Sequence, residues 1–439
     1  MTDRVASTGW VERATALAMD EWRRAADPWA GSGPRYSPRE QKVREKAYDR
    51  ALDEVRRTCR RRTPDAETRL TNCFGRFAAE ALDLGPASID LLNHGFLPIG
   101  MQLARWAHRF DPSLSQADIT QAARNAWTAC GMQPMFGAPL RLTPAILAYS
   151  LLYPYSDNYL DRENVTHRDK VRFSECFRAR LRGALPPGEP LKTEIVSMIR
   201  MIEDEFPRSS HPEVFDALLA IHAAQEESLK QLEHCGAMHE GELLRISCAK
   251  GGTSVLADAC LVRGSLDAAQ SEFAFLWGVM LQLGDDLQDA GEDLERGSDT
   301  LFTRAIRDGR PLDSLVEQLL NFAGMAAARM NALPGGSPTH KGLLRMSWRS
   351  LILFAVADAH AYFTPAFLGH IEPWSPFRFA FLRKRRQKLQ GDRGLFERLF
   401  ELVMNSKGDQ AIPLPIPENG TGSLGKVLQN VTKLQRARL

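Results

Sequence analysis

Apolar residues along the chain recur mostly at the spacing of α-helices. Alternating runs rich in Val, Ile and Thr, the mark of half-buried strands, are nearly absent. Gly- and Pro-rich breaks separate the helical segments. The chain is therefore predicted to be all-α, with helices over residues 10–26, 38–62, 66–84, 97–109, 115–131, 143–163, 167–184, 190–206, 211–235, 239–263, 266–295, 311–332, 340–370 and 376–405.

Two Gly/Pro-rich linkers, residues 27–38 and 333–338, interrupt the helical pattern, and neither is long enough to force separate domains. After Ser406 the chain holds three prolines and four glycines within 18 residues and then a short basic end, which predicts a mobile tail. We expect an N-terminal helical extension and scaffold over residues 1–135, a catalytic helical domain over 136–405 and a flexible tail over 406–439.

Charge and composition exclude several classes of protein. The 439 residues include 56 Lys plus Arg and 54 Asp plus Glu, a net charge of +2 that argues against a general nucleic-acid binder. The longest apolar stretch, Phe273 to Leu283, is well short of the ~18 residues of a membrane span. Seven scattered cysteines without a C-x-x-C pair, and a charged start without a signal peptide, predict a soluble cytoplasmic protein.

The first acidic motif is LLYPYSDNYLDRENV, in which Asp157 and Asp161 stand four residues apart on one helical face. Thr143 and Pro144 predict the start of this apolar helix, so both carboxylates lie at its C-terminal end. Carboxylates at the negative end of a helix dipole are unfavourable unless a cation offsets them. A bound metal would be such a cation, although Arg162 could also neutralise the pair.

The second acidic motif is the more unusual one, FAFLWGVMLQLGDDLQDAGEDLERG. Its helix is too apolar to have a solvent face, so its acids emerge from the protein interior. Gly278 and Gly284 permit another backbone to approach closely. At 100° per residue the acids share an arc of roughly 120° and repel one another. A cation is expected beside this set, which comprises Asp285, Asp286, Asp289, Glu292 and Asp293.

Carboxylates without His or Cys favour Mg²⁺, which usually completes its shell with water and phosphate oxygens. Each acidic motif ends an apolar helix, so a cavity between the two helices would have apolar walls. A diphosphate with a hydrocarbon tail suits that combination. Neither a P-loop nor a G-x-G-x-x-G motif follows a strand, so nucleotide chemistry has no support.

These residues resemble the class I isoprenoid (terpene) synthase superfamily over about residues 143–305. LQLGDDLQDAGEDLERG is similar to the second Asp motif of squalene and phytoene synthases, which would make Asp289 and Asp293 ligands. The same stretch also has terpene-cyclase spacing through Asp285, Asp289 and Asp293, and chain-elongating spacing through Asp285, Asp286 and Asp289. The resemblance implies an all-α bundle with a central cavity, three Mg²⁺ ions and a prenyl diphosphate substrate.

The resemblance also implies groups that bind the diphosphate. RISCAKGGTSVLADACLV is similar to the helix that offers a basic residue there, which makes Arg245 and Lys250 candidates. Tyr362 and Arg378 are candidates to cap a closed site. Aromatic faces would stabilise a carbocation, although each aromatic residue also suits a plain core position. The candidates for substrate contact are Tyr153, Tyr159, Phe273, Phe275 and Trp277.

The branch of the superfamily stays open. Asp161 is followed by one arginine and not by the paired arginines of chain-elongating enzymes, and the N-terminal extension departs from the compact phytoene synthase pattern. We expect a noncanonical Mg²⁺-dependent terpene cyclase. The alternatives are a transferase joining two prenyl diphosphates, head to head or by elongation, and a non-catalytic helical scaffold.

Two expectations concern partners. The run RKRRQK, residues 383–388, follows three phenylalanines, so the segment 377–388 is a candidate for contact with an anionic membrane, against a solvated helix face. Dimers are common in the resembled superfamily, which leaves a homodimer open.

Overall fold

The protein is all-helical over the residues that this computed structural model describes, which are 4–61, 65–160, 164–184, 191–233, 236, 238–390, 393–405 and 412. No strand occurs among them, so the predicted fold class is confirmed at the level of all-α. Within these residues, no helix combines the length and the apolarity that crossing a membrane requires.

The first part of the bundle follows the predicted helices closely. The main difference lies at residues 86–96, where a short α-helix and a π-helix precede α5 and no helix was predicted. The elements are α1 (Thr8–Arg24), α2 (Pro38–Arg61), α3 (Ala66–Leu82), α4 (Pro86–Asp90), the π-helix η1 (Leu91–Phe96), α5 (Leu97–Phe110), α6 (Gln116–Met132), the 3₁₀-helix η2 (Pro134–Phe136), α7 (Pro144–Leu160), α8 (His167–Leu181), α9 (Thr193–Glu205), α10 (Pro212–Ser228) and α11 (Lys230–Glu233).

The second part differs more, because several predicted long helices are broken. The predicted helix 266–295 is broken at Asp289, which separates a long helix from a short one, and the predicted helix 340–370 breaks after Asp358. The elements are α12 (Glu240–Arg263), α13 (Ala268–Gln288), α14 (Ala290–Arg296), α15 (Leu301–Arg307), α16 (Asp313–Ala332), α17 (Pro338–Asp358), η3 (His360–Tyr362), α18 (Pro365–Ile371), η4 (Glu372–Trp374), α19 (Phe379–Gln390) and α20 (Arg393–Asn405).

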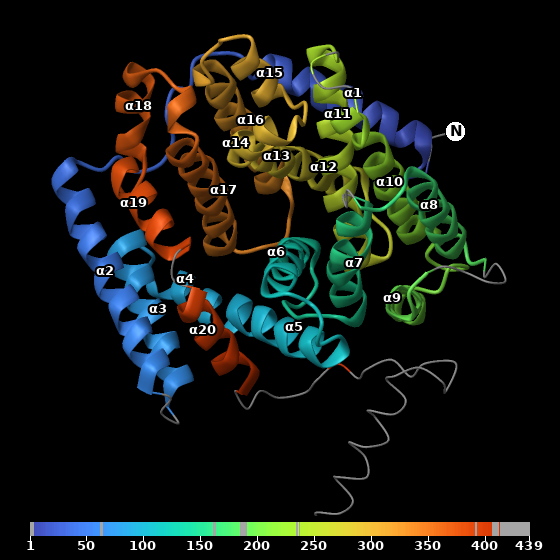
Figure 1. The fold of residues 1–439 in the computed structure, drawn as a ribbon, viewed down its shortest axis with the longest axis horizontal. Coiled ribbons are helices and arrows are strands. Elements are labelled where there is room, and N and C mark those ends of the chain that lie inside the picture. Colours follow the sequence, from blue (N-terminus) through green and yellow to red (C-terminus); the bar gives the residue numbers. More distant parts are fainter. Residues whose placement is uncertain are drawn as a thin grey trace, which may run out of the picture.

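Helix α13 lies in the middle of the bundle, against α12, α16 and α17 (Figure 1). It begins with a capping box between Asp267 and Gln270, and its apolar side chains are buried on all sides. The burial all round confirms that a helix of this composition has no solvent face.

Helix α12 packs most extensively on α13, because glycines remove the side chains between them. A Cβ atom on Gly278 would lie 2.0 Å from the backbone oxygen of Gly251, and one on Gly251 would lie 2.4 Å from the oxygen of Gly278. The predicted close approach at Gly278 is therefore confirmed. At Gly284 the nearest atom belongs to the side chain of Leu351, at 3.2 Å, and not to another backbone.

The N-terminal helix α1 packs on the same core, against α12, α13 and α16. Gln318 and Asn321 of α16 donate to the backbone oxygens of Trp22 and Ala25. One cluster of buried side chains runs from Ala6 to Phe379. Helices α1, α5 and α6 of the predicted N-terminal extension thus share the core of the helices that carry the acidic motifs, whereas Ala47 of α2 and Ala81 of α3 belong to a second cluster with Phe377.

Candidate functional site

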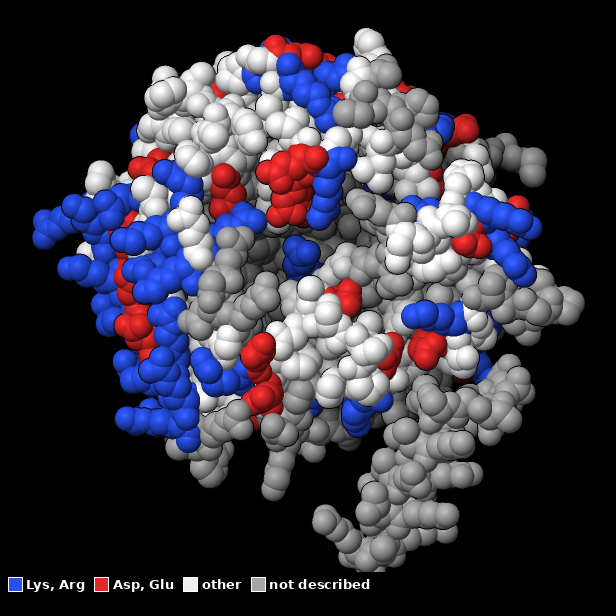
Figure 2. All heavy atoms as spheres, viewed as in Figure 1, with Lys and Arg blue, Asp and Glu red and all other residues white. Residues whose placement is uncertain are grey.

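The acidic end of α13 lies at the rim of a hollow near the middle of one face. Figure 2 shows acidic side chains gathered there over α13 and α14, with basic side chains beside and inside the hollow. The carboxylates come from the last turn of α13 and from α14, which follows directly after Asp289. The break at Asp289 turns the chain, but Asp293 stays within electrostatic range of Asp286 and Asp289.

Asp286 is the carboxylate held most firmly. It is 7% exposed and accepts hydrogen bonds from Ser247 Oγ on α12 and from Gln282 Nε2 on α13, both at 2.8 Å. Burial raises its pKa, and the two hydrogen bonds lower it in part. Since both oxygens already accept a bond, Asp286 fixes α13 against α12 and is less available to a metal than its neighbours.

Asp285 and Asp293 carry the most strongly shifted carboxyl groups of the site. Burial raises the pKa of each to about 6, and neighbouring carboxylates add to the rise. Yet the Asp285 side chain remains accessible to water, and Asp293 is half-buried. Both carboxyl groups are thus partly desolvated by protein atoms and still reachable by solvent. Within the described part of the chain, neither side chain forms a hydrogen bond or an ion pair.

Two cations face this group from neighbouring helices. Arg124 on α6 and Lys250 on α12 both lower the pKa of Asp285, Arg124 more strongly. Lys250 also acts on Asp286 and Asp293. The structure therefore brings the predicted Lys250 to the acidic motif. Sequence reasoning missed Arg124, which is a lone charge within the Ala-rich segment QAARNAW of a helix taken as scaffold.

A buried polar cluster anchors Arg124's helix. Asn125 Nδ2 donates to Ser150 Oγ on α7 at 3.1 Å and to Asp258 Oδ1 on α12 at 3.0 Å. Asp258 is fully buried, and burial raises its pKa well above the ordinary value. Through Asn125, Asp258 thus ties together α6, α7 and α12, the three helices that carry Arg124, the first acidic motif and Lys250.

The first acidic motif can be placed only in part. Asp157 belongs to the last turn of α7, which packs on α6 and α12, but its side chain and that of Tyr153 are not among those described. Asp161 lies outside the described residues. Tyr159 packs against Phe173 of α8, with ring centroids 4.6 Å apart. The predicted approach of the two motifs therefore stays a prediction.

Arg245 does not join the acidic group. It lies on the face of α12 opposite Ser247 and forms ion pairs with Glu227 at 2.5 Å and Glu242 at 2.9 Å. Hydrogen bonds to Glu242 and Glu227 raise its pKa. The side chain lines a different cavity of about 730 Å³ together with α1 and α10. Its spacing from Asp285 along the chain could not show which face of α12 it occupies.

Tyr362 and Arg378 do not form the predicted pair. The Tyr362 hydroxyl lies near Gly291, 3.7 Å from where a Cβ atom would stand on that residue. Gly291 lies between Asp289 and Asp293 in sequence but on the other side of α14. Arg378 donates instead to Glu45 of α2, with 2.7 Å between Nε and Oε1.

The predicted aromatic lining of α13 is core. Phe273 is 0% and Trp277 3% exposed, and Phe275 is likewise buried, against Trp10 and Gly252. Because α13 is enclosed on all sides, these rings contact neighbouring helices, and in this structure none offers a face to a substrate. The structure thus places Phe273, Phe275 and Trp277 in the core, and their contact with a substrate stays a prediction.

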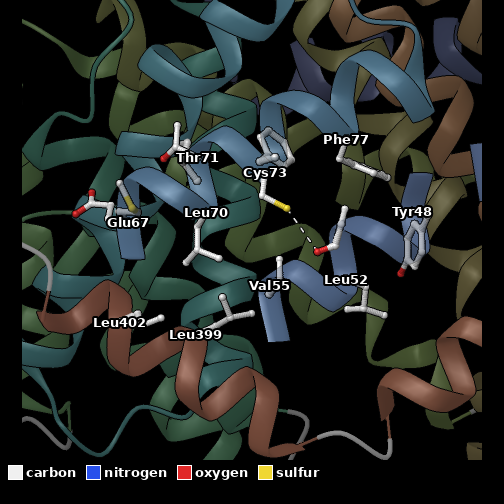
Figure 3. A pocket seen from close by; sticks show the side chains of 14 residues that line it. Tyr48, Leu52, Val55, Glu67, Leu70, Thr71, Cys73, Phe77, Leu399 and Leu402 are labelled. Atoms are coloured by element: carbon white, nitrogen blue, oxygen red, sulfur yellow. Dashed lines mark hydrogen bonds between the residues drawn. The ribbon is translucent and has the colours of Figure 1, made fainter. Parts of the chain in front are cut away.

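An apolar groove lies elsewhere, between α2, α3, α5 and α20 (Figure 3). Its volume is about 350 Å³, and it contains none of the predicted site residues. Leu399 and Leu402 of α20 point towards Leu52, Val55 and Leu70 across it. This groove is thus separate from the acidic site.

The donor set suits Mg²⁺ in chemistry, although it is not a preformed centre. Among the described side chains, no three His, Cys, Asp or Glu residues converge closely enough to hold a metal ion. Comparison of the chain with protein-family models, curated proteins and solved structures gives no significant match. Carboxylate repulsion at Asp285 and Asp293, within electrostatic range of the cations Arg124 and Lys250, nevertheless fits a site for a cation and an anion together.

Proposed function

We propose that the protein is a Mg²⁺-dependent terpene synthase that ionises a prenyl diphosphate and cyclises or rearranges the resulting carbocation. The observation that carries this proposal is the acidic end of α13, where Arg124 and Lys250 from neighbouring helices act on the carboxyl group of Asp285 and Lys250 also acts on Asp293. Acids alone would suit a cation and bases alone an anion. The combination suits an anion bridged to the acids by divalent cations.

The chain's own residues have distinct tasks in this proposal. Asp285, Asp289 and Asp293, with Asp157 and Asp161 from the first motif, would hold Mg²⁺, which supplies Lewis-acid stabilisation of the diphosphate leaving group. Arg124 and Lys250 bind diphosphate oxygens and stabilise the charge that develops on them. Asp286 positions the end of α13 through Ser247.

Ionisation breaks the bond between the allylic carbon and the diphosphate oxygen. The electron pair leaves with the diphosphate, and an allylic cation remains. An apolar cavity must then exclude water until the cation has closed or lost a proton, because water would trap it as an alcohol.

The test is incubation of the purified protein with Mg²⁺ and single prenyl diphosphates of increasing length, then pairs of them. Products are identified by mass spectrometry and diphosphate release is measured. A cyclic or rearranged hydrocarbon from one donor would support the cyclase. A product with the summed carbon count would assign the protein to the prenyltransferases, joining its donors head to head or by elongation.

Matched variants connect the activity to the site. Asp289→Asn and Arg124→Gln are each expected to lower the rate of diphosphate release about a hundredfold, as removal of one charge-stabilising group does in other enzymes. Glu295→Gln, an exposed acid on α14, is the control and is expected to leave the rate unchanged. Absence of diphosphate release from every donor would refute the proposal and leave the non-catalytic scaffold as the better interpretation.

A further inference from the structure

Positive charge is concentrated on two helices that lie more than 300 residues apart in the sequence. Helix α2 has nine basic and five acidic residues, and α19 has five basic and no acidic ones. Together they carry +9 in a chain whose net charge is +2, which leaves −7 on all other residues. Figure 2 shows Lys and Arg gathered along one edge of the molecule, over α2 and α19.

Contacts from both helices hold them side by side. Tyr48 of α2 packs edge-on against Phe377 and Phe381, with centroids 5.8 and 5.5 Å apart. Arg385 of α19 forms an ion pair with Asp49 at 2.5 Å. Arg378, just before α19, pairs with Glu45. The positions of the two helices relative to each other are therefore set by aromatic packing and by ion pairs.

The same contacts sort the charges of α2 by sign. Three of its five acids pair with residues outside α2: Glu45, which is buried, with Arg378, Asp49 with Arg385, and Glu54 with Arg76 of α3, from which it accepts a hydrogen bond at 2.6 Å. Its exposed charged residues are then mostly basic, seven against two. The exposed basic residues are Arg39, Lys42, Lys46, Arg50, Arg57, Arg60 and Arg61, and the exposed acidic ones are Glu40 and Asp53.

The seven exposed basic residues form a stripe along α2, because at 3.6 residues per turn they all fall within an arc of about 100°. Its opposite side lines the apolar groove against α3 and α20 (Figure 3). Val43, 58% exposed, lies within the stripe between Lys42 and Lys46. Lys384 and Lys388 add exposed charge from α19. We name the stripe together with these two lysines the basic edge.

We propose that the basic edge docks the protein on an anionic lipid bilayer. Diffuse negative charge on a flat surface matches a stripe of flexible Lys and Arg side chains, and an exposed Val among them suits the interfacial region. Nucleic acid is the less suitable partner, because the aromatic rings of this region, Tyr48, Phe377 and Phe381, are turned inward and offer no stacking platform. The prediction from residues 377–388 is thereby extended to α2, which forms most of the surface.

The experiment is co-sedimentation of the full-length protein with vesicles of phosphatidylcholine, alone or with about a third of phosphatidylglycerol. Binding is expected to the mixed vesicles alone and is expected to be lost at high salt, because a surface of exposed charges is screened. The test variant replaces Lys42, Lys46, Lys384 and Lys388 with Gln. Each lost charge is expected to weaken binding about fivefold, from about 1 kcal/mol per residue, so the four together weaken it at least a hundredfold.

The control separates the basic edge from net charge. It replaces four exposed arginines on other helices with Gln, namely Arg109, Arg168, Arg172 and Arg345, and so changes the net charge equally. This control is expected to bind the mixed vesicles nearly as the unmodified protein does, and circular dichroism verifies that both variants fold. Equal loss in the two variants, binding to neutral vesicles, or tighter binding to duplex DNA than to mixed vesicles would each overturn the proposal. Diphosphate release in solution tests the proposed function separately.

Discussion

The contact between Gly251 and Gly278 makes a sharp prediction about how α13 is held. A methyl group on Gly278 would stand 2.0 Å from the Gly251 oxygen and 2.7 Å from its carbonyl carbon, both backbone atoms that cannot rotate away. An ordinary contact there needs more than 3 Å, so α12 and α13 must separate by roughly 1 Å. Overpacking of this kind costs typically 1–3 kcal/mol. We therefore expect Gly278→Ala to lower the free energy of unfolding by about 3 kcal/mol.

The control is Gly324→Ala on α16. Gly324 is exposed, and nothing lies within 4 Å of its absent Cβ. Alanine is favoured over glycine inside a helix by about 1 kcal/mol, so this variant is expected to be slightly more stable than the parent. The two variants add the same methyl group and differ only in its surroundings.

Urea denaturation followed by circular dichroism measures both variants. The separation of α12 from α13 would also move Ser247 and Lys250 away from Asp286, so Gly278→Ala is expected to lose diphosphate release even where it remains folded. A Gly278→Ala protein as stable as the parent would refute the close backbone approach and, with it, the placement of Lys250 beside the acidic motif.

Three further predictions concern charge. Asp299 is fully buried and pairs with Arg304 and Arg307 at 2.8 and 2.7 Å. Asp299→Asn should therefore lower the free energy of unfolding, measured by urea denaturation, by about 3–5 kcal/mol. The control Asp308→Asn changes an exposed residue and should lower it by less than about 1 kcal/mol. Burial raises the pKa of Asp258 above the ordinary value of 3.8, so the folded state holds its proton at pH values where the unfolded state loses it. The free energy of unfolding should therefore fall as the pH rises above 3.8, and Asp258→Asn should flatten this fall. An unchanged slope would contradict a raised pKa at this buried carboxyl group. Mg²⁺ is expected to relieve the repulsion among the acids of α13 and α14. At a hundredfold excess over its Kd it should therefore stabilise the parent protein by about 2.7 kcal/mol in thermal melts, and the Asp289→Asn variant much less. Equal stabilisation of the two proteins would place the metal elsewhere.

The sequence alone determined the all-α class, the positions of most helices, and the burial of α13 on all sides. Periodicity and capping residues act locally, so they predict a helix wherever neighbouring residues agree on it. The apolar run before Asp285 predicted a helix without a solvent face, and Gly278 predicted a close backbone approach. Residues 86–96 and the breaks at Asp289 and after Asp358 escaped prediction, because short helices and interruptions depend on what packs around them.

Only the tertiary structure decided which helix faces meet. Arg245 and Lys250 lie on one helix, yet Glu227 and Glu242 hold the first away from the acids while the second acts on them. Arg124 is some 160 residues from Asp285 in the chain and is brought opposite it by the polar cluster of Asn125 and Asp258. The basic edge likewise joins helices from both ends of the chain. Spacing along a sequence shows which residues share a helix face, but the direction of that face depends on packing against the rest of the core.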